Sequence, residues 1–204
     1  MVFMNLKTVF YDWYGWNRSL FEAINGGLPE SAGFLAQVGS ALGSYWAAPL
    51  MLAALAIWAR RAGAQRRSGY AERIATQAQR FGWACLLALV VASLLKWGFD
   101  MARPATALGA ATRVLAPVDP RHSFPSGHAV YAALVLVALW PLANKFIRPL
   151  LIVALLWAGW GRIAMGAHFP ADVLGGWLVG MLCFQTVAAF TGRSKTSMKF
   201  EKTS

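Results

Sequence analysis

The sequence predicts an all-α, polytopic membrane protein: a helical bundle with five transmembrane helices, or six, plus interfacial helices at the N-terminus. Of its 204 residues, 58% are hydrophobic and only 13% are charged, whereas soluble domains carry about 25% charged residues. Residues 31–59 and 173–192 contain no charged side chain, and about 20 apolar residues in a helix cross the hydrocarbon layer of a bilayer. These observations exclude a soluble α/β enzyme and a disordered chain.

The first 41 residues differ from the rest because charged and apolar side chains are interspersed along them. Trp13, Trp16, Leu20 and Ile24 recur near helical spacing, and charged residues stand at positions 7, 12, 18 and 22. This pattern is typical of an amphipathic helix that lies in the membrane interface. We therefore expect residues 1–41 to form an interfacial segment. A sixth span here is the weaker alternative because of those charges.

Glycine and proline residues divide the remaining apolar sequence into five predicted spans. Breaks are expected near Gly63, Gly69, Pro104, Pro149, Gly166 and Pro170. Residues 42–192 are thus interpreted as one transmembrane domain and residues 193–204 as a basic cytoplasmic tail. We expect the spans to cover residues 42–60, 80–99, 128–144, 148–167 and 171–192.

The positive charges are distributed unevenly between the two sides that five spans create. The net charge is +11, from 19 Lys and Arg against 8 Asp and Glu. One side holds twelve of the cations, with only Glu72 and Glu201 to oppose them. The positive-inside rule makes this the cytoplasmic face, so the basic loops need no nucleic acid to explain them. These cations are Arg60, Arg61, Arg66, Arg67, Arg73, Arg80, Lys145, Arg148, Arg193, Lys195, Lys199 and Lys202.

The opposite side takes all three histidines of the chain and three of its aspartates. Ionisable groups near a membrane boundary are costly to desolvate and usually mark a functional site. Here they come from three separate connections and are expected to meet on one face. These residues are His122, His128, His168, Asp100, Asp119 and Asp172.

Neither the cysteines nor the N-terminus adds a further function. Cys85 and Cys183 both lie inside apolar runs, where plain packing is a better interpretation than a disulfide. No Cys and His spacing suits a metal ion, so we expect no metal and no cofactor. The N-terminus does not resemble a cleaved signal peptide.

The first candidate motif is a pair of cations at the end of the second predicted span. Six residues separate Lys96 from Arg103, and Pro104 biases Arg103 away from helical geometry. Two cations at this spacing suit a multiply charged anion. Alone, they could equally be a snorkelling lysine and an interfacial arginine.

The second candidate motif is Pro125-Ser126-Gly127-His128, which opens the third predicted span. Serine is a good N-cap, and glycine lets a ligand approach the backbone closely. The free N–H groups at a helix start, together with the helix dipole, attract phosphate. His128 would project towards that anion, although the motif alone could be an ordinary cap.

The third candidate motif comprises Arg162, His168 and Asp172. His168 and Asp172 are four residues apart, so a helix that begins near Pro170 could bring the carboxylate to the imidazole. An aspartate bonded to one ring nitrogen fixes the tautomer and leaves the other nitrogen as a nucleophile or base. Arg162 supplies a planar fork for phosphate oxygens.

Together, the three motifs offer the parts that phosphoryl transfer requires: fixed cations, a nucleophile and an acid for the leaving oxygen. Their order and spacing resemble the type 2 phosphatidic acid phosphatase superfamily, which contains membrane lipid phosphatases and soluble vanadium haloperoxidases. The resemblance runs from about residue 80 to 192. It implies a helical bundle with the site at the outer boundary of the membrane.

The resemblance also implies a role for each motif residue. His168 would attack phosphorus to form a phosphohistidine, Asp172 would hold it, and His128 would protonate the leaving group. No metal ion would be needed. The phosphate-binding residues would be Lys96, Arg103, Ser126, Gly127 and Arg162.

One position departs from the family pattern, which usually has serine before the arginine of the third motif. This chain has Gly161 there. We expect weaker phosphate binding rather than lost chemistry, because one charge-assisted bond is worth about 1.5–3 kcal/mol. Among the other polar residues, Asp100 is expected to form a salt bridge with Arg103. Asp119, Arg121 and His122 are expected to be loop residues that could also contact a headgroup.

The sequence therefore predicts a multi-pass phosphatase of the inner membrane that acts on a phosphorylated lipid from the periplasmic face. Candidate substrates are undecaprenyl or another polyprenyl diphosphate, phosphatidylglycerophosphate, phosphatidic acid and a lipid A phosphate, with a weak preference for the carrier-lipid diphosphate. The predicted partners are this lipid and the bilayer; the oligomeric state stays open. Two alternatives are a lipid phosphotransferase and a non-catalytic transporter or binder of anionic lipids. A serine hydrolase that uses Ser126 is weaker, because Phe124 and His128 occupy the glycine positions of its motif.

Overall fold

The computed structural model describes residues 9, 11–115 and 119–201, and every regular element in this part of the chain is helical. Short 3₁₀ helices cover Trp13–Gly15, Glu30–Ala32, Tyr45–Ala47 and Gly109–Ala111. The α-helices are α2 (Trp16–Gly26), α3 (Gly33–Leu42), α4 (Ala48–Ala64), α5 (Ser68–Phe99), α6 (Pro104–Leu108), α7 (Gly127–Leu139), α8 (Ile147–Ala164) and α9 (Pro170–Glu201).

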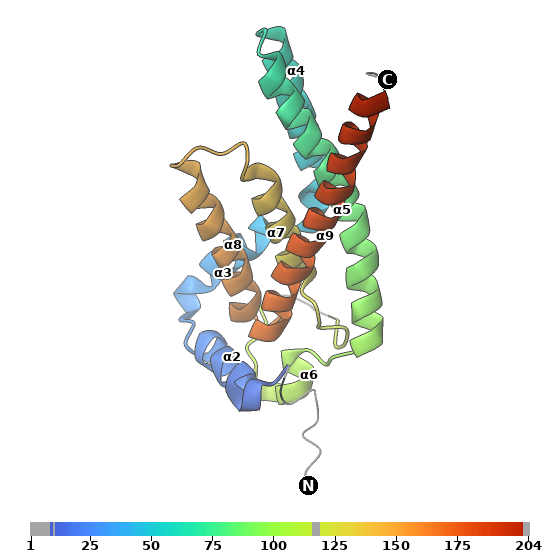
Figure 1. The fold of residues 1–204 in the computed structure, drawn as a ribbon. Coiled ribbons are helices and arrows are strands. Elements are labelled where there is room, and N and C mark those ends of the chain that lie inside the picture. Colours follow the sequence, from blue (N-terminus) through green and yellow to red (C-terminus); the bar gives the residue numbers. More distant parts are fainter. Residues whose placement is uncertain (1–8, 10, 116–118, 202–204) are drawn as a thin grey trace.

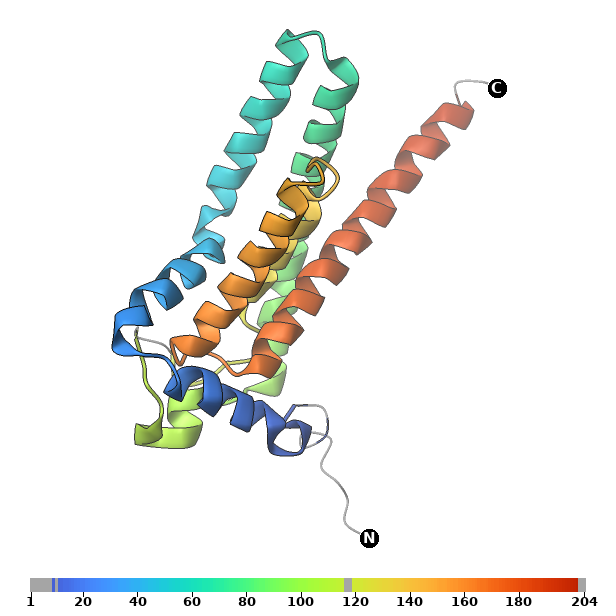
Figure 2. The same ribbon diagram turned by 90° about the vertical axis from the view of Figure 1, so that its left-hand side faces the viewer.

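The two ends of the bundle carry different parts of the chain (Figure 1). At one end lie α2, α6, the last turns of α5 and α8, and the first turns of α7 and α9. At the other end lie the tip of the α4–α5 hairpin, the loop between α7 and α8, and the end of α9 (Figures 1 and 2). The three predicted motifs thus share one end, and most of the basic residues lie towards the other.

From Trp83 onwards, helix α5 buries small side chains and exposes large ones. Ala84 and Ala88 lie in the core, and Ala88 is only 2% exposed. Leu89 and Leu94 point outwards, and Leu89 is 66% exposed. Large apolar side chains on the outside are costly in water but favourable against lipid, while small ones inside let helices approach closely. This distribution is that of a membrane helix.

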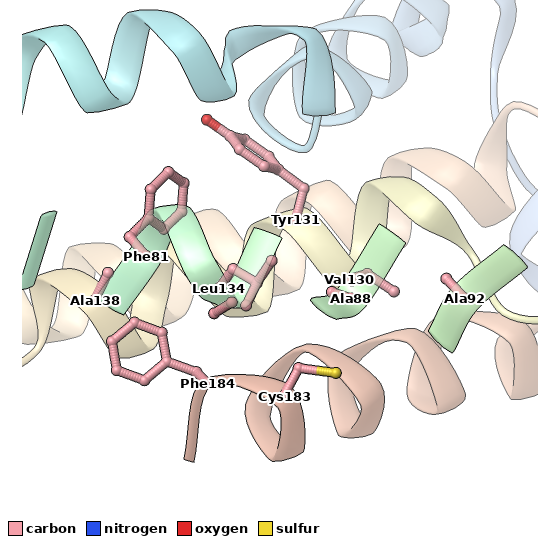
Figure 3. Packing of buried hydrophobic residues seen from close by; sticks show 10 residues of the cluster. Phe81, Ala88, Ala92, Val130, Tyr131, Leu134, Ala138, Cys183 and Phe184 are labelled. Atoms are coloured by element: carbon pink, nitrogen blue, oxygen red, sulfur yellow. The ribbon is translucent and has the colours of Figure 1, made fainter. Parts of the chain in front are cut away.

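The core is formed where α5, α7 and α9 pack against one another (Figure 3). Helix α7 supplies Val130, Tyr131 and Leu134, and each of these side chains is almost completely buried. The core is completed by Phe81, Ala84, Ala88 and Ala92 from α5, Ala138 from α7, and Cys183 and Phe184 from α9. Both cysteines are free thiols, as expected.

Within the described part of the chain, three helices are long and apolar enough to span a membrane, or four if the pair formed by α3 and α4 counts as one broken span. These three segments are Ser68–Leu108, Ile147–Ala164 and Pro170–Gly192, and the broken pair bends by 44°. The structure therefore describes a multi-pass helical membrane protein. The predicted total of five or six spans is not confirmed and stays a prediction.

Several predicted helix ends were wrong for local reasons. The third span was expected to reach residue 144, but α7 ends at Leu139, because Pro141 lacks the amide donor that would continue the helix. The fourth was expected to reach residue 167, but α8 ends at Ala164, before the left-handed backbone of Gly166 at φ 75°. Helix α9 starts at Pro170 as expected, but it continues to Glu201.

Polar side chains of the N-terminal helix α2 form hydrogen bonds with the end of α8 and the start of α9. The side chain of Asn17 accepts a hydrogen bond of 2.9 Å from the backbone of Ala171, at the start of α9. Asn25 donates to the backbone oxygens of Arg113 and Ala164 at 2.8 and 2.9 Å. Both asparagines are buried. Helix α2 therefore packs directly against the end of the bundle that holds the motifs, whereas residues 1–8 and 10 of the predicted N-terminal segment lie outside the described residues.

Gly180 offers a test of the close packing between α7 and α9. A Cβ atom at this position would lie 2.5 Å from the backbone oxygen of Val130 and 2.9 Å from the Cβ of Ala133. Gly180→Ala should therefore push the helices apart and destabilise the protein by about 1–3 kcal/mol, the usual range for overpacking. A lower thermal midpoint in detergent would show this effect. The matched control is Gly69→Ala, where nothing lies within 4 Å; an equal loss there would contradict the argument.

Candidate active site

The candidate site is organised around the carboxylate of Asp172, in the first turn of α9, which is 0% exposed. Its Oδ1 accepts a hydrogen bond of 2.8 Å from the Tyr11 hydroxyl. Its Oδ2 accepts bonds from the Ser123 hydroxyl at 2.5 Å and from the Phe169 amide at 2.9 Å. His168 Nδ1 lies 3.5 Å from the same oxygen. The carboxylate is thus held by groups from three separate segments of the chain.

The arrangement fixes the tautomer of His168. Its Nε2 lies 3.3 Å from Nη1 of Arg103, which can only donate, so Nε2 is the acceptor. The proton is then on Nδ1, which faces Asp172 Oδ2 and the Ser123 hydroxyl oxygen, each 3.5 Å away. The lone pair of Nε2 therefore points towards the cations, as nucleophilic attack requires.

Burial keeps this imidazole neutral. Loss of solvation lowers the pKa of His168 from its usual value to about 4, although the Asp172 carboxylate opposes the change. At neutral pH, His168 is therefore an uncharged potential nucleophile. Burial and the same carboxylate raise the pKa of Tyr11, so its phenol remains protonated and able to donate.

Arg103 and Lys96 are placed by the end of α5 and the break that follows. Lys96 lies in the last turn of α5, and its ammonium donates to the backbone oxygen of His122 at 2.7 Å. Arg103 has an extended backbone before Pro104, as predicted, and its Nη1 also donates to the oxygen of Ala167 at 3.0 Å. The side chain of Arg103 therefore lies across the loop that carries His168.

The second motif begins α7 as predicted, but Ser126 does not cap the helix with its side chain. Ser126 is the N-cap residue, and its own amide donates to the backbone oxygen of Asp172 at 2.9 Å. Its buried hydroxyl has no hydrogen-bond partner within the described residues. The first N–H groups of α7, from Gly127 onwards, are likewise left by helix geometry without partners in the helix. This end of α7 can therefore accept an anion.

Arg162 lies in the last turn of α8 and is 8% exposed. Its Nη1 donates to the Ser40 hydroxyl on α3 at 2.8 Å, while its Nε lacks a partner in the part of the chain that the structure describes. His128, in the first turn of α7, lies within electrostatic range of Arg162, His168, Arg103 and Lys96. The three motifs are therefore brought together in one site.

The acidic residues near Lys96 are arranged differently from the prediction. Asp100 was expected to pair with Arg103, but it pairs with Arg121 and lies 3.2 Å from Nδ1 of His122. The expected pair fails because Asp100 ends α5 in a left-handed conformation and Arg103 turns back towards Ala167. Arg121 and His122 are rim residues that hold this carboxylate.

The sequence did not reveal three residues of the site. Ser123 lies only three residues before Ser126, so its proximity to the second motif was a usable signal. Ser40 is a polar residue in an uncharged run of 29 residues, which is a weak signal. Tyr11 is 161 residues from Asp172, and nothing in its local sequence indicates the contact.

No group of three histidine, cysteine or acidic side chains that could hold a metal ion lies among residues 9, 11–115 and 119–201. Activity without a metal ion therefore stays a prediction that needs a direct test.

Comparison with known proteins adds independent information. The family model of the PAP2 superfamily matches residues 77–195. An undecaprenyl-diphosphatase from Sulfolobus acidocaldarius is 30% identical over 95 residues, which is 47% of this chain and 46% of that protein. Phosphatidylglycerophosphatase B from Bacillus subtilis is 39% identical over 83 residues, 36% of this chain and 41% of its own length. The chain thus spans less than half the length of these curated relatives.

A solved structure supports the same fold over most of the chain. The crystal structure of Aquifex aeolicus LpxE superposes with a TM-score of 0.72 at 26% sequence identity. The match covers 85% of this chain and 94% of that one. It therefore includes elements that lie outside the region matched by the family model.

The Tyr11 contact leads to a prediction about the site. Tyr11→Phe removes one donor to Asp172 but keeps the ring beside Phe124 and Phe169, whose centroids lie 6.1 and 6.3 Å away. Turnover of a lipid phosphate should fall about tenfold, because a bond to a charged group is worth about 1.5 kcal/mol or more. Initial rates of phosphate release would measure the change. Wild-type turnover in this variant would show that the phenol does not support the carboxylate.

Proposed function

The chain belongs to the PAP2 superfamily, and we propose that it is an integral membrane phosphatase that removes a phosphate group from a membrane lipid. The curated relatives act on a lipid diphosphate and a phosphatidylglycerophosphate, according to their names. They support a phosphorylated lipid as the substrate class. The choice among undecaprenyl diphosphate, phosphatidylglycerophosphate, phosphatidic acid and a lipid A phosphate is left to a substrate panel.

One observation carries this proposal: in the part of the chain that the structure describes, the cations of the site have only neutral hydrogen-bond acceptors. Within the described residues, Lys96 and Arg103 donate to backbone oxygens, and Arg162 donates to a serine hydroxyl. None of the three forms a salt bridge with a described carboxylate. Their positive charges are therefore available to a phosphate group, with Ser126 and the start of α7 as further donors.

The proposed reaction proceeds through a phosphohistidine. Nε2 of His168 attacks phosphorus as the bond to the leaving oxygen breaks, and His128 supplies the proton that this oxygen needs. Water then attacks the phosphohistidine, releases inorganic phosphate and restores His168, with His128 accepting a proton from the water. Asp172 stabilises the positive charge that the imidazole gains, while Lys96, Arg103, Ser126, Gly127 and Arg162 bind the phosphoryl oxygens.

The proposal is tested by His168→Ala in purified protein with excess chelator. Phosphate release should fall about 10³-fold or more, because the variant has lost its nucleophile. Wild type should stay active in the chelator, because fixed cations neutralise the phosphate. Inorganic phosphate released from a panel of lipid monophosphates and diphosphates is the readout.

A matched control is His122→Ala, whose imidazole lies against Trp97 at the rim of the site with ring centroids 4.7 Å apart. This variant should keep most of its activity. Three outcomes would reject the proposal. Full function of His168→Ala in cells would favour a lipid binder or transporter, and transfer to a second lipid without free phosphate would indicate a phosphotransferase. Loss in chelator with recovery on adding a divalent cation would reject metal independence.

We further propose five membrane crossings, formed by the α3–α4 pair, α5, α7, α8 and α9, with the site on the periplasmic side of the inner membrane. The described residues before α3 would lie in the interface. The basic end of the bundle would face the cytoplasm. Helix α7 alone would be about 20 Å long, so it would cross with help from the turn that follows it.

Cysteine labelling tests this orientation. Gln65→Cys and Ala110→Cys, at opposite ends of the bundle and both exposed, are made in a background in which Cys85 and Cys183 are alanine. In right-side-out spheroplasts, an impermeant maleimide should label position 110 directly and position 65 only after permeabilisation. The reverse pattern would place the site on the cytoplasmic side.

A further inference from the structure

We propose that Ser40 on α3 is a positioning residue that holds the Arg162 guanidinium in the orientation that binds the substrate phosphate. The inference rests on the proposed function, because it concerns the same site. It assigns a role in the site to α3, which lies outside all three sequence motifs.

The contact between Ser40 and Arg162 is short and buried. Nη1 of Arg162 donates to the Ser40 hydroxyl oxygen at 2.8 Å, and the residues are 6% and 8% exposed. No other side-chain hydrogen bond to this guanidinium occurs among the described residues, and its Nε has no partner there. A planar fork anchored at one nitrogen keeps its remaining N–H groups in a fixed direction. Without Ser40, the buried guanidinium would lose this anchor.

The chemistry of serine suits this task. A carboxylate in the same place would pair with Arg162 and neutralise the charge that must bind phosphate. A hydroxyl accepts the hydrogen bond and leaves the charge of the arginine intact. Its own proton can also be donated to an oxygen of the anion.

A close approach of α3 and α8 brings the short serine side chain within reach. A Cβ atom on Gly161 would lie 2.6 Å from both the Ala36 oxygen and the Ser40 nitrogen. The helices can touch here because position 161 has no side chain. The indole of Trp157 donates to the Leu35 oxygen at 2.9 Å and fastens the same pair of helices.

This geometry gives the departure at position 161 a physical reason. The serine expected before Arg162 would collide with the backbone of α3. With glycine there, α3 comes close enough to deliver a hydroxyl to Arg162 from Ser40. Gly161 and Ser40 thus act together: the glycine on α8 lets α3 approach, and the hydroxyl group that contacts Arg162 comes from α3 instead of α8.

The test compares Ser40→Ala, which deletes the acceptor, with Ser40→Cys, which keeps the shape of the side chain, is slightly larger and accepts hydrogen bonds only weakly. Both variants should lower kcat/KM about tenfold and weaken binding of inorganic phosphate by a similar factor, as expected for loss of one bond to a charged group. The matched control is Ser19→Ala. The Ser19 hydroxyl is exposed and donates to the backbone oxygen of Gly15, so it takes no part in the contact between Ser40 and Arg162. This control should leave both values unchanged.

A double-mutant cycle separates positioning from simple structural support. If Ser40 acts through Arg162, then Ser40→Ala should have little further effect on phosphate binding in an Arg162→Lys background. Full additivity would overturn the proposal, as would a lower thermal midpoint of Ser40→Ala and Ser40→Cys with unchanged phosphate binding.

The phosphate-binding measurement also separates this proposal from the proposed function. If wild type releases no phosphate from any lipid but binds inorganic phosphate, and Ser40→Ala and Ser40→Cys weaken that binding, the enzymatic function fails and the role of Ser40 stands. If wild type does not bind inorganic phosphate, both proposals fail. If Ser40→Ala does not fold, Ser40→Cys gives the decision.

Discussion

The structure depends on burying one carboxylate, that of Asp172, inside a bundle of apolar helices. An unpaired buried carboxylate costs several kcal/mol, so the surrounding chain must supply donors with good geometry. The donors come from the N-terminal segment through Tyr11, from the loop before α7 through Ser123, and from the start of α9 through the Phe169 amide. Satisfying this one group therefore brings together segments that are far apart in the sequence. The imidazole of His168 lies on the remaining side.

Small side chains make this arrangement possible. Apolar side chains drive little association between helices in lipid, so α5, α7 and α9 are held by close van der Waals contact across alanine and glycine. The same closeness places the first turn of α7 beside that of α9, where the amide of Ser126 bonds the backbone oxygen of Asp172. One backbone bond thus sets the start of α7, with His128, relative to the α9 turn that orients His168. Packing in the membrane and geometry of the site are consequences of the same contacts.

The sequence predicted those features that are determined locally. Pro170 begins α9 and Pro104 turns Arg103 out of α5, because proline restricts the backbone in its own vicinity. A four-residue spacing was enough to bring His168 towards Asp172. Prediction failed where partners are distant in the sequence. Asp100 pairs with Arg121 and not with Arg103. Tyr11 contacts Asp172, 161 residues away, and Ser40 contacts Arg162, 122 residues away. Such contacts depend on how helices dock, which spacing along the chain does not encode.

The placement of acidic groups supports the proposal that the site binds an anion. Asp172 is on the far side of His168 from Arg103, where it orients the imidazole without neutralising the cations by direct contact. Asp100 is held at the rim by Arg121 and His122. Among the described residues, the oxygen acceptors of the three motif cations are carbonyl and hydroxyl groups, which hold the cations in place without neutralising their charge. Burying a cation away from water without an opposite charge costs free energy, and a bound phosphate would offset this cost. The proposed anion binding thus depends on the hydrogen-bond acceptors that the fold provides, and those supplied by α3 and the loops are neutral.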